Sequence, residues 1–520
     1  MPVKQMLSNI SPSAGASGDL PAAPETAVIA NVISGDYRKD ALLEGLEYRW
    51  NDSGALGSAV TVTFSFPTTA PNYSDDSATA EEANGFQAFT ADQQAAVRNI
   101  LTKLSLQVGI DFTEVADSAS SYGTLRFSNN DQTAASSSGY AFLPNSNGES
   151  SGDLYIDLES STEVTPGSFG YTTLIHELGH ALGLKHPGNY NAGEATDATV
   201  VGNFLGVQDD KTILTLMSYR ESSQDLQGDW YAPFDILTLR YLYGSRAYNA
   251  TDTTYALTDL DGGKLTSLID DGGTDTIDLS ALTSGAIFNL NPGSISSFGK
   301  IWSGEASLSN LALGTDTTIE NIIASAFADT ITLNSVSNQL DGGAGIDTAI
   351  YSGNVNAYTL QKSGTAFLVN GASNDSDTLI NVERIKFADK NLAIDLDGNA
   401  GFVAKLLGTL FGKDTIQNAE YVGLALGFVD GGMSHDELMQ LALNERLGAG
   451  FSNAAEVSML FQNLAGVAPS DAEINTYVGL IGSGPDQFTQ VSLALMAADH
   501  EMSTTNINLV GLADSGLVYV

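Results

Sequence analysis

Cysteine is absent from the 520-residue sequence, which excludes disulfide bonds, thiol nucleophiles and cysteine-ligated metals. Basic residues are scarce: 21 Lys and Arg stand against 62 Asp and Glu, and the formal net charge is −41. The phosphates of nucleic acids and anionic lipid surfaces would repel such a chain, so we expect neither as a partner. Any bound metal must rely on histidine, carboxylate and backbone oxygen ligands.

Long hydrophobic runs are also missing. No apolar stretch approaches the roughly 18 residues that a membrane-spanning helix needs, so we expect no membrane span. The first residues, MPVKQMLSNISPSAGASGDLPAAP, lack the apolar core of roughly 7 to 15 residues that a Sec signal peptide requires. Residues 1–44 are rich in Pro, Ala, Ser and Gly without periodicity, which predicts a mobile leader or a short propeptide. If the protein is exported, another route must carry it.

The sequence does contain enough apolar residues for several cores. Hydrophobic residues make up 42% of the chain, too many for a disordered acidic protein, and the length predicts two to four folded domains. The surplus of Asp, Gly, Ser, Thr and Asn favours turns that offer oxygen ligands, which suits calcium. An acidic surface that only aids solubility accounts for the same surplus.

Alternating strand and helix patterns fill the region 45–248. The alternation of apolar and polar residues over 59–66 predicts a strand. Thr90 begins an amphipathic helix, whose apolar positions are Val97, Ile100, Leu101, Leu104 and Val108. Short β patterns follow at 112–114, 125–127 and 154–157, and a second helix begins near Thr172. This region is predicted to be an α+β domain.

After Gly244 the pattern is β only, and after Gly401 it becomes helical. Short strands between Gly and Asn turns repeat every nine residues, and one copy, Gly342-Gly-Ala-Gly-Ile-Asp347, matches the calcium-binding nonapeptide in full. Its neighbours are degenerate copies. We therefore predict a degenerate parallel β-roll and β region at 249–396, and an all-α module at 397–520.

Three of the five histidines lie within His176-Glu-Leu-Gly-His180-Ala-Leu-Gly-Leu-Lys-His186. Residues four apart share one helix face, so His176 and His180 can bind one ion while Glu177 stands beside them. Gly183 can adopt a left-handed conformation that ends the helix, which lets His186 supply a third ligand. Three histidines leave an open position where Zn²⁺ lowers the pKa of bound water toward about 7, and Glu177 would accept the proton as general base.

This motif resembles that of the metzincin zinc endopeptidases, and within them the serralysin group of secreted bacterial proteases. The resemblance covers about residues 45–355 and implies a metzincin catalytic domain at 45–248. It implies that Leu216-Met-Ser-Tyr219 is the Met-turn, with Met217 beneath the metal and Tyr219 as an additional zinc ligand that swings to stabilise the reacting carbonyl. It also implies that Asp235 accepts hydrogen bonds that fix the Met-turn, although a plain carboxylate at a helix amino terminus is the alternative.

Serralysins are repeat-in-toxin proteins and usually carry several consecutive Gly-Gly-x-Gly-x-Asp turns, whereas this chain keeps one complete copy. The resemblance implies a Ca²⁺ site between two facing turns. Its candidate ligands are Asp329, Asp341, Gly342, Gly343, Gly345 and Asp347. Asp329 and Asp347 lie two nonapeptides apart, the separation at which such turns face each other. An Asp-rich turn without metal is the alternative, and Asp275 is a weaker candidate.

The helical module at 397–520 lies outside the serralysin resemblance. His435 and His500 within it have no ligand-spaced partner, so we interpret them as structural or solvated. The last residues, Asp514-Ser-Gly-Leu-Val-Tyr-Val520, resemble the uncleaved export signal of proteins that type I ABC transporters secrete, and a chance apolar terminus is the alternative. The export signal would imply an extracellular protein without a Sec signal peptide.

Together these patterns predict a secreted zinc endopeptidase that acts on polypeptide substrates, with Zn²⁺ and Ca²⁺ as its metals. The substrate would bind as an extended strand along an edge of the catalytic sheet. The rival from another class is a surface-associated calcium-binding adhesin or scaffold that retains a metal-binding fold. Glu177 argues against this rival, because a structural zinc site needs no base and usually has four protein ligands. A hydrolase of other substrates also fits the motif, and nothing in the sequence identifies a protein inhibitor.

Overall fold

The computed structural model describes residues 8–9, 23–73, 75, 80–134, 137–160, 163–188, 190, 202–220, 224–371, 375–482, 484 and 487–520. The chain divides into two compact units. Unit 1 comprises Met1–Thr276 and Phe288–Ile319, and unit 2 comprises Ile277–Ile287 and Glu320–Val520. The predicted boundary at 248 therefore falls inside unit 1. Within the described ranges, no helix has both the length and the apolar character needed to cross a bilayer.

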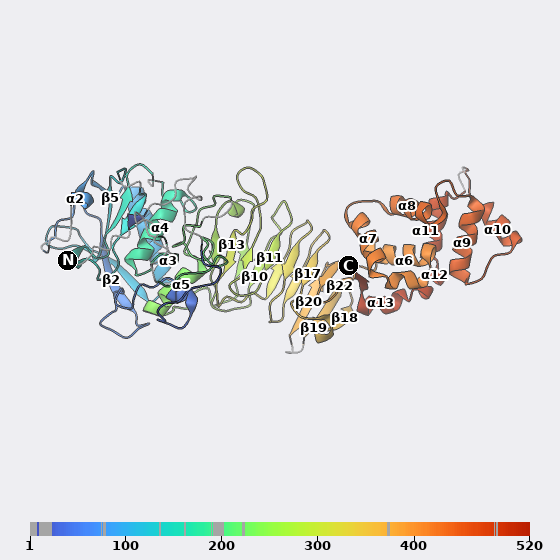
Figure 1. The fold of residues 1–520 in the computed structure, drawn as a ribbon, viewed down its shortest axis with the longest axis horizontal. Helices are drawn as coiled ribbons and strands as arrows, with labels where there is room; N and C mark the ends of the chain where they lie inside the picture. The colour runs from blue at the N-terminus through green and yellow to red at the C-terminus, as the bar shows by residue number, and fades with distance from the viewer. Residues whose placement is uncertain are drawn as a thin grey trace. The chain divides into compact units, whose positions relative to one another are not determined.

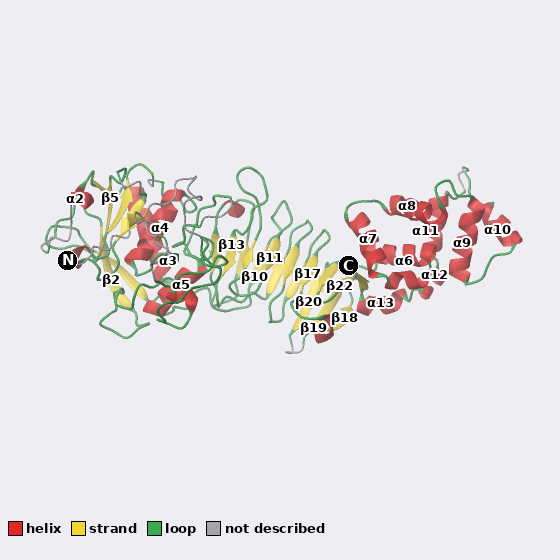
Figure 2. Ribbon diagram, in the orientation of Figure 1, coloured by secondary structure: helices red, strands yellow, loops and turns green. Residues whose placement is uncertain are grey.

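Unit 1 contains a seven-stranded sheet with the order β1-β6-β7-β5-β2-β4, in which β3 also pairs with β5 (Figures 1 and 2). The strands are β1 (Ser8–Asn9), β2 (Val60–Ser65), β3 (Gln87–Ala88), β4 (Ile110–Glu114), β5 (Leu125–Asn130), β6 (Gly139–Ala141) and β7 (Leu154–Asp157). The pairs β2–β4, β2–β5 and β5–β7 are parallel, whereas β6 is antiparallel to β7. The four strands predicted in this region are confirmed. Strand β6 was not predicted.

The helices of unit 1 are α1 (Tyr37–Asp40), α2 (Ala80–Ala83), α3 (Ala91–Ser105), α4 (Phe169–Ala181) and α5 (Pro233–Tyr243), with 3₁₀ turns η1 (Gly148–Ser150) and η2 (Asp261–Gly263). Helix α3 begins with the predicted cap: Thr90 accepts a hydrogen bond from the backbone of Gln93, and the Gln93 side chain accepts one from the backbone of Thr90. The apolar face of α3 is buried, which confirms its predicted amphipathic character.

Part of the predicted leader is built into unit 1. Residues Ala41–Leu43 are fully buried in its hydrophobic core. The Asp40 carboxylate accepts a hydrogen bond from the backbone of Ser34 at 2.6 Å, and Val28 forms an antiparallel bridge with Phe204. Residues of the predicted leader thus make backbone and core contacts within unit 1. Residues 1–7 and 10–22 of that leader lie outside the described residues.

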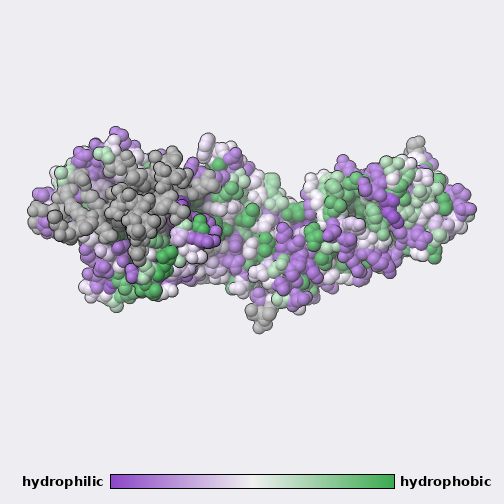
Figure 3. Space-filling model, viewed as in Figure 1, coloured by the Kyte–Doolittle hydropathy of each residue, from purple (hydrophilic) through white to green (hydrophobic). Residues whose placement is uncertain are grey.

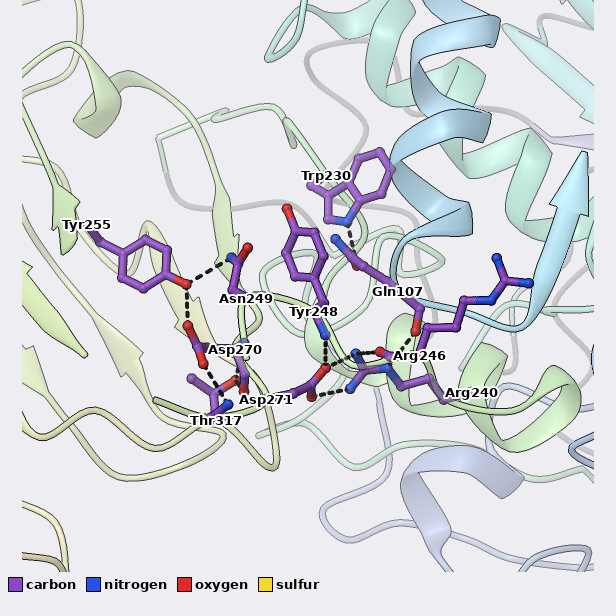
Figure 4. A network of polar contacts seen from close by, with 11 residues as sticks. Gln107, Trp230, Arg240, Arg246, Tyr248, Asn249, Tyr255, Asp270, Asp271 and Thr317 are labelled. Carbon is purple, nitrogen blue, oxygen red and sulfur yellow. Dashed lines mark hydrogen bonds and ion pairs between the residues drawn. The ribbon is translucent and has the colours of Figure 1, made fainter. Parts of the chain in front are cut away.

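A polar network ties α5 to the segment that follows it (Figure 4). Arg240 of α5 forms an ion pair with Asp271 at 2.7 Å, and its Nε donates to the carbonyl of Gln107 at 3.0 Å. The Gln107 side chain accepts the indole N–H of Trp230 at 3.1 Å, and Asp271 accepts the backbone N–H of Tyr248 at 2.8 Å. Both charged groups are largely buried, so removal of one partner would leave a poorly solvated charge and cost more than breaking an exposed ion pair. Further along unit 1, β9 (Thr266–Leu268), β12 (Ile295–Ser296) and β13 (Leu311–Leu313) form one sheet, and β8 (Thr254–Ala256) also lies in this unit.

Short parallel strands in unit 2 pair with partners two nine-residue repeats further along the chain. In β14 and β16, Asn321 lies opposite Gln339, and in β15 and β17, Thr330 lies opposite Thr348. The remaining β bounds are β10 (Thr276–Asp278), β11 (Ile287–Asn289), β14 (Asn321–Ile323), β15 (Thr330–Thr332), β16 (Gln339–Asp341), β17 (Thr348–Ile350), β18 (Thr359–Ser363), β19 (Ala366–Asn370), β20 (Ser376–Ile380), β21 (Arg384–Lys386) and β22 (Asn391–Ala393), with the 3₁₀ turn η3 (Val355–Ala357). These registers bring nonapeptide turns that are two repeats apart next to each other.

Helices dominate the chain after Asn399, which confirms the predicted helical module. They are α6 (Asn399–Phe411), α7 (Ala419–Asp430), α8 (His435–Leu447), α9 (Asn453–Ala465), α10 (Asp471–Val478), α11 (Gln490–Asp499), α12 (Glu501–Asn506) and α13 (Leu509–Ser515), with the 3₁₀ turn η4 (Lys413–Gln417). Hydrophobic residues also reach the surface here, among them Tyr421, Leu424 and Phe428 (Figure 3). The chain ends in β23 (Leu517–Tyr519), which pairs antiparallel with β22.

Candidate metal centre

Helix α4 and the turn after it carry the three histidines of the motif. Helix α4 ends at Ala181, and Gly183 has a φ of +103°, which confirms the predicted left-handed turn. A Cβ at Gly183 would collide with the carbonyl oxygen of Tyr48, so only glycine fits this turn. The chain then folds back and brings His186 to the face of α4 that carries His176 and His180.

The ring nitrogens of these histidines converge. The Nε2 atom of His186 lies 3.2 Å from Nε2 of His176 and 3.0 Å from Nε2 of His180. The Nδ1 atoms of His176 and His180 each lie 2.7 Å from a carbonyl oxygen, that of Leu216 and that of Leu184 respectively. These contacts assign the hydrogen to Nδ1 in both rings, so that their Nε2 lone pairs face the shared centre.

Burial keeps the His176 and His180 rings neutral. It lowers the pKa of His176 to about 4 and lowers that of His180 well below its usual value. Neutral lone pairs this close repel one another unless a cation lies between them, so the donor set fits a metal ion. Among the described residues, only these three histidines form a group whose ligand atoms all lie within 4.8 Å of one another. Three imidazoles with an open position are typical of catalytic zinc.

Met217 packs against the helix that carries the histidines. Its side chain is fully buried. A Cβ at Gly179 would lie 2.8 Å from Sδ of Met217, so glycine at this position makes room for the thioether. The predicted Met-turn residue therefore contacts α4 one residue before His180.

Asp235 links the start of α5 to the segment before Met217. Its buried carboxylate accepts hydrogen bonds from the Thr215 hydroxyl at 2.6 Å, the Leu216 N–H at 2.8 Å and the Ala232 N–H at 2.9 Å. Because the Leu216 carbonyl in turn accepts from Nδ1 of His176, this carboxylate helps to orient that ring. The two interpretations of Asp235 are thus compatible: it caps α5 and also holds the turn.

We expect Asp235→Ala to destabilise unit 1 and Asp235→Asn to do so much less. Alanine leaves two buried backbone N–H groups without an acceptor, a loss of about 2 to 5 kcal/mol in the free energy of unfolding. The asparagine oxygen can still accept both N–H groups, while its amide donates to the Thr215 hydroxyl. Burial raises the pKa of Asp235 to about 6, so a neutral amide also removes the cost of a buried charge. Urea unfolding of both variants measures the difference, and equal losses would contradict this account.

Tyr219 lies beside two of the histidines. Its ring centroid is 5.8 Å from that of His176, with nearly parallel planes, and 4.5 Å from that of His186. Burial raises the pKa of Tyr219 well above its usual value, and the charge of Glu177 adds to this shift. The hydroxyl therefore remains protonated and able to donate a hydrogen bond.

Glu177 belongs to helix α4, and its side chain packs against strand β6. Its side chain is fully buried. A Cβ at Gly139 of β6 would lie 2.8 Å from Cγ and 3.2 Å from Oε1 of Glu177, so glycine there leaves space for the carboxylate arm. The structure thus brings the predicted base, the three histidines and strand β6 together.

Two residues near Tyr219 were not singled out from the sequence. Tyr190 is buried with its ring 5.1 Å from that of Tyr219, and Asp210 is buried beside the Tyr190 hydroxyl. Neither residue has a recognisable spacing from the histidine motif, because the contacts depend on how two loops meet. In unit 2, the ring of His435 stacks on that of Phe402 with centroids 3.8 Å apart, and His500 caps α12.

The candidate calcium ligands lie in neighbouring turns, but their carboxylate oxygens differ in the hydrogen bonds that they accept. Asp329 accepts hydrogen bonds from Ala286 and from Ser325 of its own turn, at 2.6 and 2.8 Å. Asp347 accepts the backbone N–H of Asp329 at 2.7 Å through Oδ1, whereas its buried Oδ2 has no hydrogen-bond partner. Asp341 accepts from Gly343 at 3.1 Å.

The glycines of the complete repeat have the backbone that its turn requires. Gly343 and Gly345 have φ of +84° and +132°, values that favour glycine. A Cβ at Gly342 would lie 2.7 Å from Oδ2 of Asp347, so this carboxylate oxygen faces the turn. Asp275, the weaker candidate, accepts the backbone N–H of Thr253 at 2.8 Å.

The described site is thus a group of three histidines beside a carboxylate, and comparisons with known proteins show what the chain is similar to. Residues 234–403 match the family model described as Peptidase M10 serralysin C terminal. The chain is 31% identical to Serralysin A of Dickeya chrysanthemi over 303 residues, which cover 54% of this chain and 60% of that protein. It is 32% identical to Metallopeptidase AprA of Pseudomonas marginalis over 328 residues, which cover 57% and 64% of the two chains. The chain thus spans about 60 to 64% of the length of these curated relatives.

Proposed function

We propose that this protein is a zinc-dependent endopeptidase of the serralysin type. The observation that carries the proposal is the convergence of three buried imidazoles beside Glu177, whose side chain packs against strand β6. The similarity to serralysins supports the same activity. His176, His180 and His186 would hold the zinc ion, and Tyr219 would be a further ligand in the resting enzyme.

The bound zinc would supply Lewis acidity, which polarises the scissile carbonyl and lowers the pKa of the attacking water. Glu177 would take a proton from that water and then deliver it to the amine nitrogen that leaves. Tyr219 would donate a hydrogen bond from its protonated hydroxyl to the carbonyl oxygen as negative charge builds there.

A substrate peptide would bind as a strand against β6. This edge already accepts an extended segment of the chain itself, because β1 pairs antiparallel with β6 through Ser8–Tyr140 and Asn9–Gly139. Gly139 is also the residue that packs against Glu177. A peptide that takes the place of β1 beside β6 would therefore run past the proposed base.

Casein digestion with and without a zinc chelator tests the activity. We expect proteolysis that the chelator abolishes and that added Zn²⁺ restores. An adhesin or scaffold with the same fold would leave casein intact in every condition. A hydrolase of other substrates would leave casein intact but cleave ester or amide model compounds in a zinc-dependent way.

We also propose that Ca²⁺ binds beside Asp347. The orphaned buried Oδ2 supports this, because a carboxylate oxygen without a hydrogen-bond partner fits a cation. Burial and the nearby charges of Asp329 and Glu383 raise the pKa of Asp347 to about 8, so the free carboxylate is unfavourable here. Asp341 and carbonyl oxygens of the glycine turn would supply other ligands. Asp329 already accepts several hydrogen bonds, so few ions are expected, about one or two.

We expect millimolar Ca²⁺ to raise the melting temperature of chelated, zinc-reloaded protein by about 5 °C or more. Calcium at a hundred times its dissociation constant would add about 2.7 kcal/mol to the stability of the folded state. Asp347→Ala should remove most of this gain, whereas Ala at the exposed Asp397 should leave it intact. Scanning calorimetry measures both. An Asp347→Ala variant that responds to calcium like the wild type would make this repeat a turn without metal.

We also propose that the protein is secreted. Serralysin-like activity fits an extracellular protein that leaves the cell through a type I ABC exporter. The residues that resemble the export signal include β23, which is partly buried and pairs with β22. An exporter would therefore have to recognise this segment before β23 joins its sheet.

A further inference from the structure

Tyr219 is held by a buried cluster of residues that do not bind the metal. The cluster consists of Tyr190, Asp210, Ser218 and Arg220. Tyr190, Asp210 and Ser218 are all at most 3% exposed. Two separate loops meet here: Tyr190 follows the third histidine closely, and Ser218 and Arg220 flank Tyr219.

The side-chain hydrogen bonds of this cluster converge on the Asp210 carboxylate. The Tyr190 hydroxyl donates to Oδ1 of Asp210 at 2.8 Å, and its oxygen accepts the backbone N–H of Tyr219 at 3.2 Å. Asp210 also accepts from the Ser218 hydroxyl at 2.6 Å and from Nε of Arg220 at 2.9 Å. Because Asp210 takes the hydroxyl hydrogen of Tyr190, a lone pair of that oxygen is directed to the Tyr219 amide.

Ring packing reinforces the same arrangement. The rings of Tyr190 and Tyr219 are stacked with centroids 5.1 Å apart, and the Tyr190 ring lies 6.1 Å from that of His186. A Cβ at Gly188 would collide with the Tyr190 ring, so glycine at this position allows the ring to lie between the loop and Tyr219. Tyr190 therefore contacts Tyr219 through both its ring and its hydroxyl.

We propose that Tyr190 and Asp210 are positioning residues that set the place of the Tyr219 hydroxyl above the metal centre. This proposal rests on the proposed peptidase function. Tyr190 does not touch the substrate or the metal in this account, and it acts only through Tyr219. The ring stack fixes the plane of Tyr219, and the hydrogen bond fixes the backbone from which its side chain extends.

A double-mutant cycle tests this route. Tyr190→Phe keeps the ring stack and removes the hydrogen bond to the Tyr219 amide. We expect kcat on a peptide substrate to fall about tenfold while KM stays within about twofold, since the effect appears when charge builds on the carbonyl. In a Tyr219→Phe background, Tyr190→Phe should change kcat by less than about twofold, because the hydroxyl it positions is already gone. Equal effects in both backgrounds would overturn the proposal.

A second measurement needs no catalysis. Amide hydrogen exchange followed by mass spectrometry should show faster exchange in the peptide that contains Tyr219 when Tyr190 is Phe, with zinc content and the exchange of the other peptides of unit 1 unchanged. Faster exchange across unit 1, or a variant that loses zinc, would mean a general structural role and would overturn the proposal. If the Tyr190 variant does not fold, Asp210→Asn tests the same hydrogen-bond chain by both readouts.

Tyr37→Phe is the matched control. The Tyr37 hydroxyl donates to Asp209 at 3.0 Å, so it too is a tyrosine bound to an aspartate, but it lies at the surface. Its loss should leave kcat and the exchange near Tyr219 unchanged. If wild-type protein cleaves no peptide, the proposed function fails, while the exchange measurement still decides whether Tyr190 holds the Tyr219 backbone.

Discussion

Glu177→Gln is expected to retain zinc and to lose peptidase activity by about 10³-fold or more. Glutamine has nearly the same shape as glutamate, so it can occupy the space beside Gly139 without strain. It cannot accept a proton from the attacking water at neutral pH, and it therefore cannot pass one to the amine. The three histidine ligands remain in place, because their orientation depends on the carbonyls of Leu216 and Leu184.

Steady-state cleavage of a fluorogenic peptide, together with elemental analysis, measures this prediction. Glu163→Gln makes the same chemical change at an exposed position before α4 and should leave activity at the wild-type level. A Glu177→Gln enzyme within tenfold of wild type would remove this residue from the mechanism. Loss of zinc together with activity would mean that Glu177 supports the site and not the proton transfer.

His180→Ala is expected to reduce bound zinc from about one equivalent to well below a tenth after dialysis, with complete loss of peptidase activity. His180 is fully buried, and its Nε2 faces that of His186, so no water can easily replace it. Removal of one of three ligands also lowers the stability that zinc lends to unit 1, and the melting temperature should fall accordingly.

His500→Ala provides the control for the zinc measurement. His500 is exposed and accepts a backbone hydrogen bond at the start of α12, so its loss should not affect zinc content. If wild type and His180→Ala both bind about one zinc, the ion is held elsewhere and the assignment of the centre is wrong. If neither binds zinc, the three histidines serve another metal or none.

Local patterns in the sequence predicted the elements that carry the chemistry. The spacing of His176 and His180 places both rings on one face of any helix, and Gly183 alone allows the turn that follows. Both features could therefore be predicted from residues close together in the sequence. The strand at 59–66 and the capped helix after Thr90 are local in the same sense. These are the parts of unit 1 that the structure confirms.

Features that depend on contacts between distant segments could not be predicted from the sequence. Strand β6 is only three residues long, and its position in the sheet depends on pairing with β7. Asp210 meets Tyr190 because two loops converge, and no period in the sequence encodes that meeting. The burial of Ala41–Leu43 was missed for a similar reason, since a Pro- and Ser-rich segment before them gave no sign of a core.

The contact between Gly179 and Met217 has a consequence for how this sequence can evolve. Any side chain at position 179 of α4 would collide with Sδ of Met217, which lies in a loop nearly forty positions further along the chain. The two positions should therefore coevolve. A lineage that gains alanine at 179 should survive only if residue 217 is smaller or if the loop has moved. The glycine inside the histidine motif is thus under selection from outside the motif, and a library randomised at both sites together should recover combinations that single-site libraries never reach.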